Sequence, residues 1–253
     1  MATTYVDLET MKISVSGNTD VGLKRKRNED SFLVVPEIDL YIVADGMGGH
    51  KGGDYASSNA VAILKEVAEK HLENSTYFSP RAMLEEGYSE ASRRIYNKSK
   101  DPEFEKQGMG TTMVAAFFHE GSLYIGNVGD SRAYLFDDEF MWQLTEDHSL
   151  LNEHLKAGLI KDSEIETFQS KNVITRSVGF EGDVRCDIFQ RKVQPGDKYL
   201  LCSDGLCGLV KDQRIHEIIK DVGIEKSVEL CIAEAKKNGG DDNITAVVIS
   251  VEN

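Results

Sequence analysis

The sequence has few of the features that mark secreted, membrane-bound or zinc-binding proteins. Its 253 residues include four prolines and four cysteines, and no low-complexity tract. No apolar run approaches the roughly 20 residues that span a bilayer. The first twelve residues carry acids in place of an apolar stretch, so we expect no signal peptide, no membrane association and a cytoplasmic location. The cysteines, which lack CxxC spacing and paired histidines, favour reduced core thiols over zinc ligands: Cys186, Cys202, Cys207 and Cys231.

Positive charge is also scarce. The chain has 43 acidic and 29 basic side chains, a formal net charge of -14. This balance argues against a nucleic-acid partner, because phosphate backbones attract surplus lysine and arginine. Most of the acidity is explained by solubility, and the alternative, that part of it holds cations, depends on where the acids lie.

The hydrophobic pattern predicts an α+β protein. Short β-rich apolar runs predict strands at 12–16, 32–35, 40–44, 112–118, 123–128, 132–136, 140–144, 184–193, 198–202 and 244–251. Helical spacing predicts helices through 61–72 and 84–95, the second capped by Ser79 with Pro80 at its first position, and others at 212–220 and 225–237. Clustered strands and paired helices without βαβ alternation favour a layered α+β domain.

No linker rich in Pro, Gly or Ser divides the chain, so we expect one domain over residues 1–253. Its interior holds one distinct segment. Residues 149–171 are polar and helical in character, with Leu151, Leu155 and Leu159 on one face. We expect an inserted subdomain at about 149–172.

Acidic residues stand where predicted strands begin or end. Four acidic turns each abut an apolar strand: Glu29-Asp30, Asp45-Gly46, Asp204-Gly205 and Asp241-Asp242. Asp-Gly often marks only a turn, and this explains any one of these sites alone. Four carboxylate groups at converging strand ends repel one another unless cations lie between them. An oxygen-only set favours Mg²⁺ or Mn²⁺, and two such ions activate water for in-line attack on phosphorus.

A basic run, Lys24-Arg25-Lys26-Arg27, directly precedes one of these acidic turns. Such a run is commonly a solvated loop or a nonspecific anion patch. Beside metal-bound carboxylates, however, an arginine can hold the non-reacting oxygens of a phosphate bidentately.

Seven motifs, in order, resemble the metal-dependent type 2C protein phosphatases, and the Asp-Gly-Met-Gly-Gly-His form is similar to their compact bacterial branch. They span roughly residues 18–251: Asp20-Val21-Gly22 with Arg25 and Asn28-Glu29-Asp30, Asp45-Gly46-Met47-Gly48-Gly49-His50, Gly108-Met109-Gly110-Thr111-Thr112, Gly129-Asp130-Ser131-Arg132, Ile174-Thr175-Arg176-Ser177-Val178-Gly179, Ser203-Asp204-Gly205 and Asp242-Asn243-Ile244-Thr245. The resemblance implies a four-layer α-β-β-α sandwich of two antiparallel sheets flanked by helices. It also implies that residues 149–172 are the variable flap beside the active site.

The same resemblance implies a set of metal ligands for Mn²⁺ or Mg²⁺. Asp45 would bridge two ions, the Gly46 carbonyl would bind one of them, and Asp204 and Asp242 would complete the second ion's ligands. Asp130, together with Asp204, would form a third and weaker site. A hydroxide bridging the two core ions would attack phosphoserine or phosphothreonine in protein substrates directly. An opposing bacterial serine/threonine kinase and a monomeric enzyme are further expectations from the resemblance.

The resemblance also implies catalytic side chains. Arg25 would bind the substrate phosphate, and Glu29 and Asp30 would orient metal-bound waters. Some family members place a histidine directly after Asp-Gly, where this chain has Met47. His50, the nearest histidine, is either the acid that protonates the leaving group or a structural residue of a glycine-rich turn, and a metal-bound water is another candidate acid.

Three further residues are predicted to be structural: His148 as an anchor of the flap, and Arg132 and Arg176 as salt-bridge partners. Two rival functions are an inactive phosphoprotein-binding relative and a two-metal nuclease or phosphodiesterase. The complete aspartate set disfavours the first, and the net charge of -14 disfavours the second. No cysteine lies in a phosphate-cradling loop, which disfavours thiol-based phosphatase chemistry.

Overall fold

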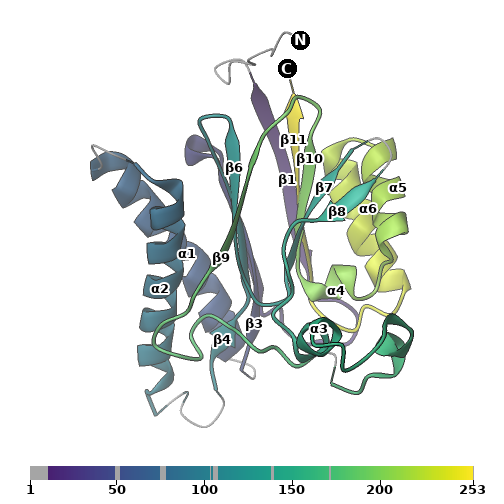
Figure 1. Cartoon of the computed structure of the whole chain (residues 1–253), viewed down its shortest axis with the longest axis horizontal. Coiled ribbons are helices and arrows are strands. Elements are labelled where there is room, and N and C mark those ends of the chain that lie inside the picture. Colours follow the sequence, from purple (N-terminus) through teal and green to yellow (C-terminus); the bar gives the residue numbers. More distant parts are fainter. Residues whose placement is uncertain are drawn as a thin grey trace.

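Two antiparallel sheets lie face to face at the centre of the molecule (Figure 1). The computed structural model describes residues 11–48, 52–74, 78–102, 104, 108–137, 140–170 and 172–252. In the first sheet the order is β1 (Lys12–Asp20), β11 (Ile244–Glu252), β10 (Lys198–Cys202), β7 (Arg132–Phe136) and β8 (Met141–Gln143). In the second it is β2 (Asp30–Val35), β3 (Leu40–Met47), β5 (Met113–His119), β6 (Ser122–Val128) and β9 (Asp187–Lys192), with the short β4 (Gly110–Thr111) paired to the end of β3.

Helices cover the outer face of each sheet (Figure 1). The second sheet carries α1 (Gly52–Asn74) and α2 (Pro80–Ser99), whereas α5 (Asp212–Asp221) and α6 (Ile224–Lys237) cover the first. Within the described residues, the remaining helical segments are short: α3 (Leu150–Lys156), α4 (Asp204–Cys207) and two 3-10 helices, Pro36–Ile38 and Asp162–Thr167. The predicted four-layer sandwich is therefore confirmed.

Apolar side chains along the central strands point alternately into the core between the two sheets and towards the helices. In β3, Tyr41 and Val43 point into the core between the sheets, while Leu40, Ile42 and Ala44 point to α1 and α2. A strand buried on both faces reads as a continuous apolar run, because successive side chains point to opposite sides. The run that ends at Asp45 is such a strand, so its carboxylate emerges from a rigid, doubly packed support.

Most predicted elements are confirmed, with shifted ends. The Ser79 hydroxyl accepts a hydrogen bond from the Ala82 amide at 3.3 Å and caps α2 as predicted. Strand β1 continues to Asp20, β8 is shorter than its predicted range, and β9 begins at Asp187. The one-turn helix α4 was not predicted.

The continuous apolar face predicted for the flap is wrong. Helix α3 ends at Lys156, and Gly158 then takes a φ of 66°, a left-handed conformation that terminates helices. Leu159 is consequently 68% exposed and does not share a buried face with Leu151 and Leu155.

All four cysteines are free thiols, as predicted, and three of them are buried. Over the described ranges, no helix combines the length and apolarity needed to cross a membrane. The expectation about a signal peptide falls largely on residues 1–10, which lie outside the described residues.

Candidate metal centre

The strand register gathers the predicted acids at the end of the sandwich opposite the start of β1 and the end of β11, where β3, β4 and α4 lie in Figure 1. Antiparallel pairing of β2 with β3 sets Asp30 directly opposite Asp45. In the other sheet β10 ends at Cys202, so that Asp204 opens α4, and Asp242 lies just before β11, the neighbour of β10. Carboxylates from both sheets thus meet at one end.

Asp30 is buried at the bottom of this cluster. Its Oδ2 accepts hydrogen bonds from the Ser203 hydroxyl at 2.8 Å and the Thr245 hydroxyl at 2.6 Å, while its buried Oδ1 has no partner. Burial, joined by the charges of Asp204 and Asp242, raises the pKa of Asp30 to about 7, against the two hydroxyl bonds that lower it. This carboxyl therefore lacks the compensation that a buried charge needs.

Other acids of the cluster also have raised pKa values. Burial, followed by repulsion from Asp30 and Asp204, raises the pKa of Asp45 well above its ordinary value. Burial also raises the pKa of Asp204, whose Oδ1 has no partner, and that of Asp130, to about 7. Repelling carboxyls with unpartnered oxygens are the environment that divalent cations relieve, and the all-oxygen set suits Mn²⁺ or Mg²⁺. The donor set fits these metals.

Two glycines allow the backbone to pack closely beside Asp45. A Cβ on Gly46 would lie 2.2 Å from the Gly53 carbonyl oxygen, and a Cβ on Gly53 would lie 2.1 Å from Glu29 Oε2. The end of β3, the first turn of α1 and the Glu29 side chain therefore meet at a point where a larger residue does not fit. Gly53 was not singled out from the sequence, and its only signal there is its position at the start of a helix.

Hydroxyl and amide side chains hold the acidic loops in place. Thr112 Oγ1 accepts from the Asp45 amide at 3.0 Å and lies 2.6 Å from Ser131 Oγ, next to Asp130. Asn243 Oδ1 accepts from the Glu29 amide at 2.8 Å, while its Nδ2 donates to carbonyls of the loop that carries Arg25. The sequence placed these residues in motifs but gave no role to them.

Arg25 reaches the cluster. Its Nη2 lies 2.7 Å from Asp242 Oδ2, and its side chain is 53% exposed. The other Asp242 oxygen accepts from the Asn243 amide at 2.8 Å. In the part of the chain that the structure describes, no group of three or more His, Cys, Asp or Glu side chains is placed so that it could hold a metal ion. The fold thus gathers the acids but leaves Asp242 engaged with Arg25.

Of the two histidines with predicted roles, the structure describes only one. His50 lies outside the described residues, so both interpretations of it stay open. Met47 is the last residue of β3, paired with Gly110. His148 is buried at the start of the flap, as expected for an anchor.

Both arginine predictions are confirmed. Arg132 Nη2 lies 2.6 Å from Asp147 Oδ2, and Arg176 Nη1 lies 2.7 Å from Asp187 Oδ1.

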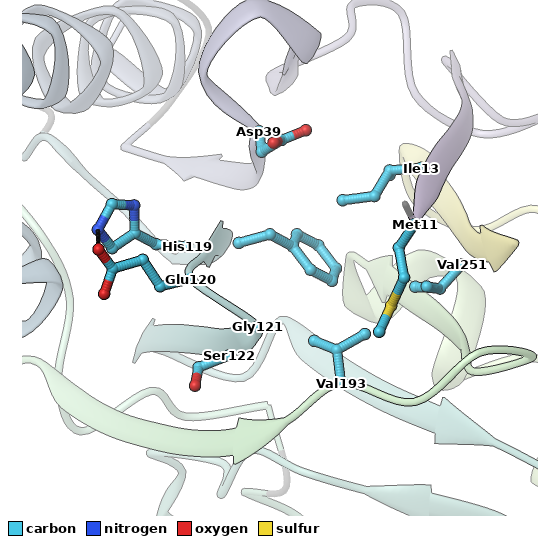
Figure 2. A pocket seen from close by; sticks show the side chains of 10 residues that line it. Met11, Ile13, Asp39, His119, Glu120, Gly121, Ser122, Val193 and Val251 are labelled. Carbon is cyan, nitrogen blue, oxygen red and sulfur yellow. Dashed lines mark ion pairs between the residues drawn. The ribbon is translucent and has the colours of Figure 1, made fainter. Parts of the chain in front are cut away.

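A separate cavity of about 280 Å³ opens at the other end of the sandwich (Figure 2). Figure 2 shows an apolar floor that includes Ile13 and Val193, and a rim with Asp39, His119 and Glu120. Asp39 directly precedes β3, whereas Asp45 lies near the other end of that strand. The cavity therefore does not belong to the carboxylate site.

Comparison with known proteins gives consistent matches. The family described as protein phosphatase 2C matches residues 24–229. The serine/threonine phosphatase stp of Listeria innocua is 38% identical over 235 residues, which cover 91% of this chain and 93% of that protein. The crystal structure of the Mycobacterium tuberculosis serine/threonine phosphatase PstP/Ppp has a TM-score of 0.86 at 31% identity, covering 95% of this chain and 99% of that one. A structure of the PstP catalytic domain in complex with two manganese ions has a TM-score of 0.85 at 31% identity, with 96% and 100% coverage.

Proposed function

Because the chain belongs to the protein phosphatase 2C family, and is a metal-dependent serine/threonine protein phosphatase that uses Mn²⁺ or Mg²⁺, we propose that its strand-end carboxylates hold the metal ions. Asp45 would contribute ligands to two ions, and the Gly46 carbonyl would be a further ligand of one. Asp204 and Asp242 would hold the second, and Asp130 with Asp204 would offer a third position. One observation carries this assignment: the unpartnered Oδ1 of Asp204, buried among acids whose pKa values are raised together.

When bound, the two ions would activate a water for attack on phosphorus, from which the serine or threonine oxygen departs. The chain's own residues do the rest. Arg25 is mostly exposed and exchanges its ion pair with Asp242 for the equatorial oxygens of the substrate phosphate, whose negative charge it stabilises. Asp242 would thereby become available as a metal ligand.

Glu29 and Asp30 position water at the ions. Asp30 is fixed by Ser203 and Thr245, and its free Oδ1 is the atom that would accept from such a water. Glu29 is held through its amide by Asn243 and has its carboxylate above Gly53. His50 remains one of the candidate acids for the leaving oxygen.

Phosphorylated proteins are the substrates. We further propose that the enzyme opposes a serine/threonine kinase and acts as a cytoplasmic monomer of one catalytic domain, with the flap at 149–172 facing the substrate.

The test is phosphate release from a phosphothreonine peptide over a Mn²⁺ titration. Asp204→Asn and Asp242→Asn should each lose most of the Mn²⁺-dependent turnover and keep the thermal unfolding temperature of the wild type in EDTA or exceed it. Asp241→Asn is the matched control, because Asp241 is exposed and adjacent to Asp242. Near-normal turnover in both site variants would refute the ligand assignment. Cleavage of single-stranded DNA or bis-p-nitrophenyl phosphate without peptide turnover would refute the function.

A further inference from the structure

The flap is joined to the rest of the molecule through a narrow neck. Its two ends, residues 148–150 and 173–175, run antiparallel, with Ser149 paired to Ile174. The Leu150 amide donates to the Val173 carbonyl at 2.8 Å, and the Thr175 amide donates to the His148 carbonyl at 2.9 Å. These backbone hydrogen bonds fix the two ends of the flap relative to each other. A shift of the neck would therefore move the residues that it contacts.

One of its contacts is the residue before Asp130. The His148 amide donates to the Gly129 carbonyl at 2.9 Å, and the Gly129 amide donates to His148 Nδ1 at 3.0 Å. Gly129 has a φ of 105°, and a Cβ there would lie 2.5 Å from Thr112. His148 thus holds a backbone conformation that favours glycine, immediately ahead of a proposed metal ligand.

A carboxylate fixes the ring of this histidine. Since Nδ1 accepts, the proton is on Nε2, which lies 3.1 Å from Asp187 Oδ2. The other Asp187 oxygen accepts from Arg176 Nη1 at 2.7 Å, just beyond the far end of the neck. These two bonds lower the pKa of Asp187 against a raising effect of burial. Asp187, on β9, therefore ties both ends of the flap to the second sheet.

We propose that His148 is a positioning residue that couples the flap to the Asp130 carboxylate. Its Nδ1 holds the Gly129–Asp130 backbone, and its Nε2, through Asp187, holds the flap neck. The inference rests on the proposed function in two respects, that Asp130 binds a metal and that the flap faces the substrate. Outer groups that orient ligands in this way commonly change metal affinity by about 10- to 100-fold when removed.

The two ring nitrogens can be tested separately. In His148→Asn, the side-chain Oδ1 replaces Nδ1 as the acceptor for the Gly129 amide, but nothing reaches Asp187. In His148→Gln, the Nε2 amide replaces the donor to Asp187, but no acceptor remains at the δ position. Each variant therefore restores one bond and removes the other.

We expect His148→Gln to weaken Mn²⁺ binding at the weakest calorimetric site about tenfold. Its KM for a phosphothreonine peptide, measured at saturating Mn²⁺, should stay near that of the wild type. His148→Asn should keep the Mn²⁺ affinity and raise the peptide KM about fivefold through lost orientation of the flap, with an unchanged KM for p-nitrophenyl phosphate. Asp187→Asn, at a partly exposed position, should reproduce the His148→Asn pattern and serves if the buried substitution prevents folding.

Equal losses in both His148 variants, or wild-type behaviour in both, would overturn the coupling and leave His148 a structural anchor. Asp130→Asn separates this failure from a failure of the premise. If Asp130→Asn leaves the Mn²⁺ affinities unchanged, the proposed role of Asp130 is wrong. If it weakens the weakest site and His148→Gln does not, the positioning role of His148 is wrong.

Discussion

Substitution of Asp30 by Asn should stabilise the metal-free enzyme, and more so at higher pH. The carboxyl of Asp30 is 7% exposed and its pKa is raised from 3.8 to about 7, chiefly by burial. Folding therefore favours the protonated form. This contribution to stability is complete below about pH 4 and is lost as the pH rises through about 7. Asparagine is neutral at every pH and can still accept from Ser203 and Thr245, so it escapes this loss.

The size of the effect follows from the pKa. Each pKa unit corresponds to about 1.4 kcal/mol. The free energy of unfolding should therefore rise on substitution by about 4 kcal/mol at pH 8 and by about 2 kcal/mol at pH 5. Because the neighbouring acids can rearrange around the Asp30 charge, both values are upper bounds. The free energy of unfolding, measured by urea titration in EDTA, should thus be higher for Asp30→Asn than for the wild type, with the larger gain at pH 8.

Asp241→Asn, at the exposed position nearby, is the control and should show no such pH-dependent gain. Saturating Mn²⁺ should narrow or reverse the difference, because the wild type gains more free energy from metal that binds only its folded state. Equal gains at both pH values, or a less stable variant at pH 8 in EDTA, would show that Asp30 is not a destabilised buried acid.

Two other substitutions separate the site from the scaffold. Gly53→Ala places a Cβ 2.1 Å from Glu29 Oε2, so kcat should fall at least about tenfold from the displaced carboxylate, and unchanged turnover of the peptide would contradict the close packing at this point. Tyr88→Phe removes the hydroxyl that lies 2.8 Å from the Gly126 carbonyl and 3.1 Å from that of Met113, in the core between the helices and the second sheet. It should lower the free energy of unfolding by about 1–3 kcal/mol with kcat unchanged, and a loss of turnover in a folded variant would speak against that separation.

The layered α+β class could be predicted from the clustered strands and paired helices of the sequence, whereas the four-layer arrangement was implied by the family resemblance. The strand register could not be predicted. Asp30 stands opposite Asp45 only because the hairpin between them is closed by a 3-10 turn at Pro36–Ile38 and a left-handed Asp39, whose φ is 52°. Residue type alone does not determine such a turn, since non-glycine residues seldom adopt this conformation.

The acids of the site could be predicted from their positions at strand ends, but their partners could not. Arg25 and Asp242 are 217 residues apart in sequence, and their pairing depends on β11 lying beside β1. The hydrogen bonds between His148 and Gly129 likewise depend on the flap neck folding back onto β6 and β7. In the flap itself, the apolar spacing predicted one helical face that extends to Leu159. The left-handed conformation of Gly158 interrupts that face.

The central claim is that carboxylates from the ends of both sheets hold the metals of this phosphatase. Anomalous diffraction from crystals grown with Mn²⁺, collected on either side of the manganese absorption edge, tests it most directly. We expect two strong manganese peaks enclosed by Asp45, Asp204 and Asp242, with Asp242 turned away from Arg25. Manganese bound elsewhere, with these carboxylates free of metal and the Arg25–Asp242 ion pair intact, would contradict the account.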